Sequence, residues 1–204
     1  MKTCIALIGA AVVAVAWPAT YGAPTLSLVE TGTNSTTSGT IAEGTDALQL
    51  DLRLDTDGLP VSGLEFAVES SPAGTLVYGN TPVTALGAPF TSDDLFPTLS
   101  AGDTVQADGT APIVLFKNDG DDYSAFHASI LQLNFDTHLL APGQYVITPL
   151  PNEFTNAAQV LESGDFAQSQ PFTLTVTATP EPGALGALCV GAMGLLKRQR
   201  SRAK

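Results

Sequence analysis

Four segments of the chain alternate apolar and polar residues with a period of two, the pattern of a strand that buries one face and exposes the other. The clearest is residues 48–54, where leucines alternate with Gln49, Asp51 and Arg53. The pattern recurs in residues 64–68, 131–135 and 172–176. These segments predict antiparallel sheet packed on one side.

Further strands are expected at residues 25–30, 75–78, 113–117 and 144–148. Turn pairs such as Asp57-Gly58 and Pro142-Gly143 separate them. No segment has the pattern of a long amphipathic helix. Eight or nine strands punctuated in this way predict an all-β fold, an antiparallel β-sandwich. Residues 31–40 are expected to form a loop, and residues 82–110 a long loop with a short helix.

The first 22 residues have the pattern of a secretory signal peptide. Lys2 supplies a positive charge, residues 5–15 form an apolar core, and Trp17-Pro18 ends the expected signal helix. Cleavage after Gly22 would leave small residues at both positions that a signal peptidase recognises. The alternative is that the segment is not cleaved and anchors the chain in the membrane. Residues 23–179 then form one domain, because roughly 155 residues suffice for a single core. It lacks cysteine, since Cys4 and Cys189 both lie in the terminal segments.

The last 25 residues, 180–204, have three successive parts. The motif Pro180, Glu181 and Pro182 comes first, and the uncharged residues 183–196 follow. As a helix these would span about 21 Å, less than the roughly 30 Å of membrane hydrocarbon. The C-terminal end is basic, with Lys197, Arg198, Arg200 and Arg202. These residues are expected to stay on the cytoplasmic side and to act as a membrane stop. The alternative is an ordinary tail anchor.

This order of motif, short apolar helix and basic end resembles the PEP-CTERM sorting signals of exported bacterial proteins. The resemblance covers only the tail. It implies export through the secretion translocon, transient membrane anchoring, and processing by an exosortase-like membrane enzyme. The mature protein would then be at the cell surface or in the extracellular matrix.

Residues 23–179 contain two basic residues, Arg53 and Lys117, and 19 acidic ones, which gives a net charge of −17. Such a surface repels nucleic acid and attracts cations. The segment 118–122 is the most concentrated group of oxygen ligands, and it offers Asp119, Asp121 and Asp122 as a weak calcium candidate. An acidic glycine-containing loop is more commonly a solvated turn, and no other cofactor or metal is expected.

The sequence contains no enzyme signature. Asp55-Thr56-Asp57-Gly58 reads as a turn, because Arg53 and Leu64 stand where an EF-hand loop needs carboxylates. His127 is expected on the wet face of a strand and His138 in a turn, without catalytic or zinc-binding roles. We therefore expect no catalytic residues and no enzymatic activity.

The strand order from Leu26 through Gly63 to Tyr145 also resembles the cohesin-like modules, which are nine-stranded jelly-roll sandwiches. No residue string in it is diagnostic, so the resemblance implies the fold and not a partner. The expected role is structural or adhesive, with extracellular polysaccharide as one partner. The alternative is a carbohydrate- or protein-binding module. Sugar binding would require exposed aromatic residues gathered on one face, with these candidates: Tyr78, Phe90, Phe96, Tyr123, Phe126 and Tyr145.

Overall fold

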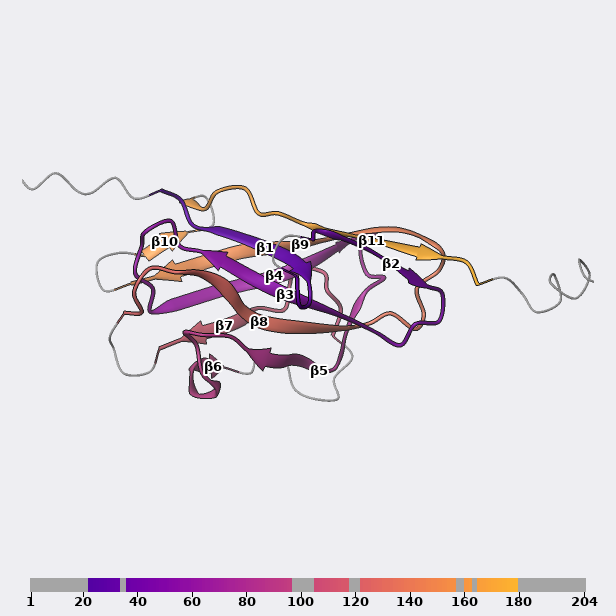
Figure 1. The fold of residues 1–204 in the computed structure, drawn as a ribbon, viewed down its shortest axis with the longest axis horizontal. Helices are drawn as coiled ribbons and strands as arrows, with labels where there is room; N and C mark the ends of the chain where they lie inside the picture. The colour runs from indigo at the N-terminus through magenta and orange to yellow at the C-terminus, as the bar shows by residue number, and fades with distance from the viewer. Residues whose placement is uncertain are drawn as a thin grey trace, which may run out of the picture.

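The computed structural model describes residues 22–33, 36–96, 105–117, 122–156, 160–162 and 165–179. These residues form two β-sheets packed face to face (Figure 1). The four-stranded sheet, called sheet A here, has the order β1-β3-β8-β5. Its strands are β1 (Thr25–Glu30), β3 (Ala47–Asp55), β8 (His127–Asp136) and β5 (Val77–Leu86).

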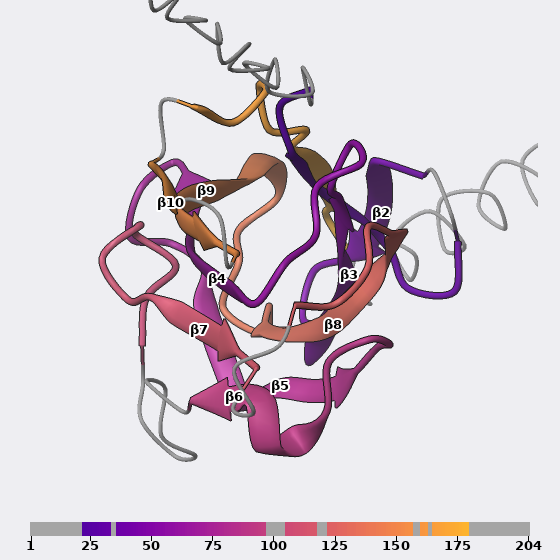
Figure 2. The same ribbon diagram turned by 90° about the vertical axis from the view of Figure 1, so that its left-hand side faces the viewer.

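The second sheet, called sheet B, has seven strands. Its order is β2-β11-β9-β4-β7-β6, and β10 pairs with β9 beside this path. The bounds are β2 (Ser38–Ala42), β11 (Phe172–Thr177), β9 (Gly143–Thr155), β4 (Gly63–Ser71), β7 (Ile113–Phe116), β6 (Leu95–Phe96) and β10 (Val160–Glu162). Seen from one end, the two sheets surround a common interior (Figure 2).

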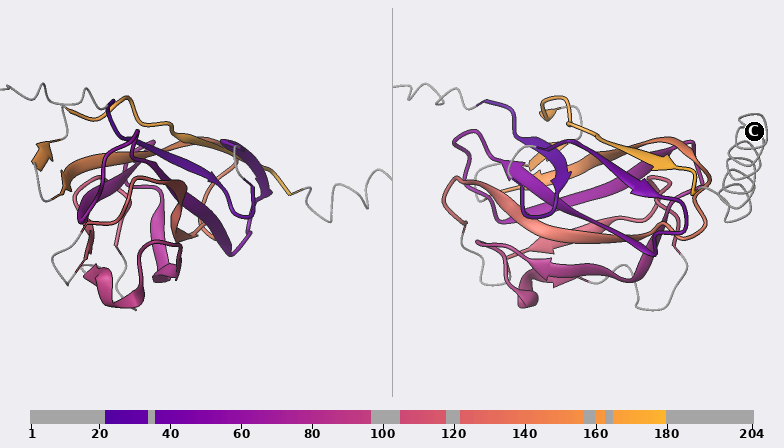
Figure 3. Two further views of the ribbon diagram at one scale, coloured as in Figure 1. Left: turned by 60° about the vertical axis from the view of Figure 1, so that its left-hand side comes forward. Right: turned by 45° about the vertical axis from the view of Figure 1, so that its right-hand side comes forward.

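The first six strands, β1 to β6, alternate between sheet A and sheet B. β1 lies in sheet A, whereas β2 crosses to sheet B and runs parallel to β11, beside it in the right-hand view of Figure 3. All other strand pairs are antiparallel. β1 begins and β11 ends at opposite ends of the long axis (Figure 1). The chain therefore leaves the sandwich far from where it enters.

The core consists of the apolar positions that alternate along the strands. In β3, Leu50, Leu52 and Leu54 are fully buried, while Gln49 between the leucines is exposed. The largest fully buried side chains are four phenylalanines, one from each of four strands: Phe66, Phe135, Phe154 and Phe172. The all-β sandwich expected from the alternation is confirmed, as are all four alternating segments.

Three details differ from the expectation. The described residues contain eleven strands instead of eight or nine, because β6 and β10 are too short to show a period. β2 occupies part of the expected loop 31–40, since its parallel partner β11 lies far away in the sequence. β5 continues through Pro82 to Leu86 inside the expected loop 82–110, where the helix η1 (Ser92–Asp94) is confirmed.

Two tyrosines differ in the hydrogen bonding of their hydroxyl groups. Tyr78 is 3% exposed and stacks on Phe135 at 5.2 Å between ring centroids, and its hydroxyl has no hydrogen-bond partner among the described residues. Burial raises the pKa of this phenol well above its ordinary value. The Tyr123 hydroxyl instead donates to Asp94 Oδ2 at 2.8 Å, and the same oxygen accepts from the Thr91 N–H at 2.8 Å. Asp94 thus joins η1 to the segment that leads into β8.

The two Tyr→Phe substitutions should therefore differ in their effect on stability. Tyr78→Phe removes an unsatisfied buried hydroxyl and should leave stability unchanged or raise it by up to about 1 kcal/mol. Tyr123→Phe removes a hydrogen bond to a carboxylate that is 4% exposed, and should cost about 1–3 kcal/mol. Urea denaturation of both variants measures the difference. Equal losses in the two variants would contradict this account of the hydroxyls.

The two expected terminal helices, the signal helix before Trp17-Pro18 and the apolar helix 183–196, lie outside the described residues. Within the described ranges, no helix has the length and apolar character needed to cross a membrane.

Candidate binding surfaces

The outer face of sheet A presents ordered rows of polar side chains. Strand register places Thr25 and His127 on either side of Asp55, and Ser27 and Ser129 on either side of Arg53. In the next row, Val29 and Gln132 flank Asp51. The outward residues of β3 thus alternate in charge as Asp51, Arg53 and Asp55. Arg53 is only 9% exposed despite facing outward.

An ion pair holds the Asp55 end of these rows. His127 Nδ1 lies 2.9 Å from Asp55 Oδ2. The Asp57 N–H donates to Asp55 Oδ1 at 3.0 Å and is the main cause that lowers the pKa of Asp55 below its ordinary 3.8. The hydrogen bond and charge of His127 and the charge of Arg53 act in the same direction, against burial. Asp55 is therefore ionised at neutral pH.

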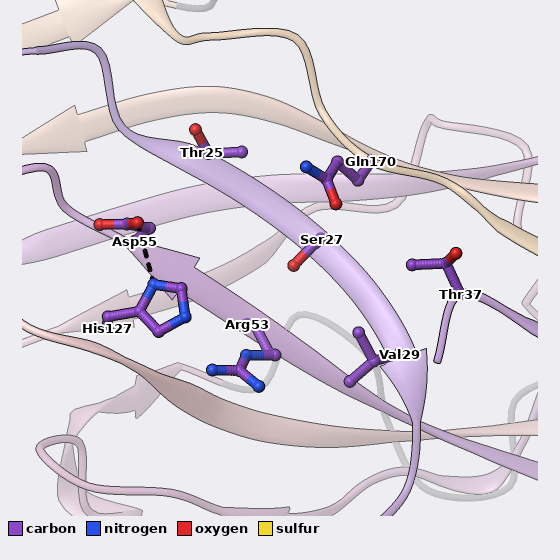
Figure 4. A pocket seen from close by; sticks show the side chains of 8 residues that line it. All are labelled: Thr25, Ser27, Val29, Thr37, Arg53, Asp55, His127 and Gln170. Carbon is purple, nitrogen blue, oxygen red and sulfur yellow. Dashed lines mark ion pairs between the residues drawn. The ribbon is translucent and has the colours of Figure 1, made fainter. Parts of the chain in front are cut away.

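A cavity of about 240 Å³ opens over these rows (Figure 4). Strands β1, β3 and β8 form its floor, and the segments at Thr37 and Gln170 close its edge. Gln170 is held there because its N–H donates to the Leu26 carbonyl at 2.9 Å and its carbonyl accepts from the Leu28 N–H at 3.2 Å. The lining residues, called the β3 groove below, are Thr25, Ser27, Val29, Thr37, Arg53, Asp55, His127 and Gln170.

The outer face of sheet B has a different character. Phe116 at the end of β7 is 42% exposed and lies opposite Gly63 of β4, where a Cβ atom would come within 2.9 Å of the ring. Val114 faces outward one row away, beside Glu65, which pairs with Glu153 of β9. This surface, called the Phe116 face below, combines an exposed aromatic ring with carboxylates.

Five of the six aromatic residues proposed for sugar stacking do not form an exposed platform, and the side chain of the sixth, Phe96, lies outside what the structure describes. Tyr78 and Phe90 are each 3% exposed and Tyr145 is 7% exposed, so all three belong to the core. Tyr123 and Phe126 are half-buried and make edge-to-face contacts with Phe90. The structure therefore contradicts an aromatic sugar platform built from these residues. Phe116 was not among the expected residues, because a lone phenylalanine at the end of a strand resembles a core position.

The sites expected from the sequence fall mostly beyond the described part of the chain. Pro180, Glu181, Pro182 and the basic residues 197–202 lie there, as do Asp119 and Asp121 of the calcium candidate. Of that cluster only Asp122 is described, and the described residues contain no group of three or more metal-binding side chains. His127 opens β8 with an exposed side chain and His138 lies in the turn after it, as expected.

Comparison with known proteins shows what the sandwich resembles. No protein-family profile matches the chain, and no curated protein matches it. Solved cohesin structures do match. The third cohesin ScaC of Acetivibrio cellulolyticus, solved in complex with the ScaB dockerin, has a TM-score of 0.50 at 10% sequence identity, over 76% of this chain and 99% of that one.

Two further cohesins match at lower scores. The solution structure of CaCohA2 from Clostridium acetobutylicum has a TM-score of 0.45 at 13% identity, over 77% of this chain and 92% of that one. A non-cellulosomal cohesin from the archaeon Archaeoglobus fulgidus has a TM-score of 0.42 at 10% identity, over 78% and 95%. At these identities the likeness concerns the fold, and the expected cohesin-like β-sandwich is confirmed.

Proposed function

We propose that this chain is an exported bacterial surface protein whose sandwich is a non-enzymatic protein-binding module. The observation that carries the proposal is the Phe116 face on a cohesin-like sandwich. Phe116 remains 42% exposed on a sheet, and aromatic residues such as phenylalanine are enriched in protein–protein interfaces relative to the rest of the surface. In this proposal the sandwich holds a partner and catalyses no reaction.

The chemistry of the Phe116 face indicates what partner would fit. Glu65 and Glu153 face each other on neighbouring strands, and Glu69 is exposed further along β4. A partner would need an apolar pocket for the ring and basic groups for these carboxylates, because complementary charge speeds association and excludes wrong partners. We propose a small dockerin-type module with a basic contact surface, since the ScaC cohesin was solved with a dockerin.

The sorting part of the proposal rests on the tail sequence. The PEP-CTERM-like order of Pro180-Glu181-Pro182, apolar segment and basic end supports processing by an exosortase-like enzyme. β11 ends at one end of the long axis, and the tail follows it directly (Figure 1). A tail held at the membrane from that end would leave both outer faces of the sandwich accessible.

Substituting Phe116 tests the binding role. The full chain would be compared with Phe116→Ala in capture experiments on dockerin-type modules and on surface extracts of the producing cells. We expect a partner whose affinity falls at least 10-fold in Phe116→Ala, since loss of an interface anchor commonly costs 2 kcal/mol or more. Glu65→Gln should weaken binding more strongly at low salt than at high salt, because salt screens interactions between exposed charges.

Leu139→Ala is the matched control for this experiment. Leu139 is 89% exposed but lies in the turn after β8, away from the Phe116 face. Partner binding should be unaffected by this substitution. If the Phe116→Ala and wild-type chains capture the same partners with equal affinity, the Phe116 face is not the binding surface.

A further inference from the structure

The β3 groove is a second surface, on the sheet opposite to the Phe116 face. Its floor holds Arg53, the only arginine of residues 23–179. A residue of this kind usually extends its charge into solvent, yet Arg53 is 9% exposed and lines a cavity. The fold thus holds one guanidinium in a defined place under the groove.

The charge of the groove is nearly balanced. Arg53 lies between Asp51 and Asp55 on the same face of β3, and Asp55 is also paired with His127. Asp51 is already occupied by hydrogen bonds from Thr31 Oγ1 at 3.2 Å and Gln132 Nε2 at 3.5 Å. Because the surrounding domain carries a net charge of −17, an anionic ligand would be repelled before it reached Arg53. The groove therefore favours a neutral ligand.

The lining offers hydrogen-bonding groups of both kinds. The hydroxyls of Thr25, Ser27 and Thr37 and the amide of Gln170 can each donate and accept. His127 Nδ1 is directed to Asp55, and Figure 4 shows the second ring nitrogen turned away from Asp55 toward the groove, where it can hydrogen-bond to a ligand hydroxyl. Val29 is the one apolar residue of the lining.

A ligand that matches this lining is small, uncharged and rich in hydroxyl groups. The 240 Å³ volume is below the roughly 300–1,000 Å³ of pockets for drug-sized molecules, so the groove can hold about one sugar ring. A second hollow of about 120 Å³, on the β5 side of the same face, includes Ser129, the row partner of Arg53. A linear saccharide could extend from one hollow toward the other across the strands.

We propose that the β3 groove is a binding subsite for a neutral saccharide unit. The guanidinium of Arg53 donates to ring hydroxyls, Asp55 accepts from them, and His127, Gln170 and the hydroxyls of the lining orient the ring. No aromatic residue lines the groove, so binding relies on hydrogen bonds alone. A dissociation constant on the order of 1 mM for a single ring follows from this, because such bonds replace equally good bonds to water.

Saturation-transfer NMR on the full chain tests the proposal, with methyl glycosides of glucose, galactose and mannose as probes. Galacturonate serves as the charged counterpart of the galactoside. We expect saturation transfer to at least one neutral glycoside, and weaker binding of galacturonate than of the galactoside. Arg53→Gln should reduce the affinity at least 10-fold, since it removes charge-assisted hydrogen bonds.

Two further variants keep the test decisive. Thr25→Val removes one hydroxyl of the lining while keeping the β-branched shape, and should weaken binding even if Arg53→Gln fails to fold. His138→Ala is the control, because His138 forms a similar pair with Asp46, at 3.6 Å, outside the groove. Absence of saturation transfer from all three glycosides, binding that is unchanged in Thr25→Val, or tighter binding of galacturonate would each overturn the proposal. None of these outcomes depends on the Phe116 face.

Discussion

Replacing Phe135 with alanine should lower the free energy of unfolding by about 3–5 kcal/mol. Phe135 is fully buried on β8, a central strand of sheet A, and its ring stacks on Tyr78. The substitution removes the ring and leaves a cavity that the two packed sheets can only partly close. Domains of this size typically have 5–15 kcal/mol of stability in total, so a large part would be lost.

Urea denaturation of the full chain, followed by circular dichroism, measures this loss. The matched control is Phe116→Ala, the same chemical change at a ring that is 42% exposed on sheet B. It should cost much less, because its ring remains in contact with water when the protein is folded. Equal shifts of the denaturation midpoint in the two variants would mean that Phe135 is not a core residue.

The strands that carry this core could be predicted from the sequence because they bury one face. Leu50, Leu52 and Leu54 alternate with polar residues, and the two-residue period of a strand turns all three toward the core. β2 gave no such signal, since its burial alternates only between exposed and half-buried residues at the edge of sheet B. Its position depends on parallel pairing with β11, about 130 residues later in the chain, which local pattern cannot reveal.

The β3 groove was only partly visible in the sequence. The alternation placed Asp51 and Arg53 on the solvent-exposed face of their strand. It did not identify the residues that lie opposite them on the neighbouring strands. A register shift between Leu52 and Arg53 brings His127 opposite Asp55; the unshifted register would place Ala128 there. A β-bulge of this kind is a property of the paired strands. It could not be read from either strand alone.

The aromatic residues show a second limit of sequence analysis. Tyr78, Phe90 and Tyr145 are each separated from the strictly alternating segments, so their exposure could not be inferred from a period. In the structure, the packing of sheets and loops buries all three. The alternation of apolar and polar residues predicts burial where a strand is regular. It does not predict burial where tertiary contacts from distant segments cover a residue.

The tail carries the prediction with the largest effect on the fate of the protein. Glu181 is the only charged residue between the end of the sandwich and Lys197, and prolines stand on both sides of it. Proline restricts its neighbours to extended backbone, which presents Glu181 outside any helix. The uncharged residues 183–196 are short for a permanent span, and the basic end should hold the tail across the membrane from the cytoplasmic side. A membrane-embedded enzyme could then reach the motif where the chain leaves the bilayer.

Substituting Glu181 with alanine should therefore leave export intact and block processing of the tail in cells that contain an exosortase-like enzyme. The Pro-Ala-Pro segment keeps the backbone restriction but loses the one charge available for recognition. Mass spectrometry of the surface fraction distinguishes the forms, because the unprocessed chain retains peptides from residues 183–204. Glu162→Ala, an acidic position within the sandwich, is the matched control and should be processed like the wild type. Residues 183–204 still present in the mature wild-type protein would identify the tail as an ordinary anchor, since a sorting signal is removed once the enzyme has acted on it.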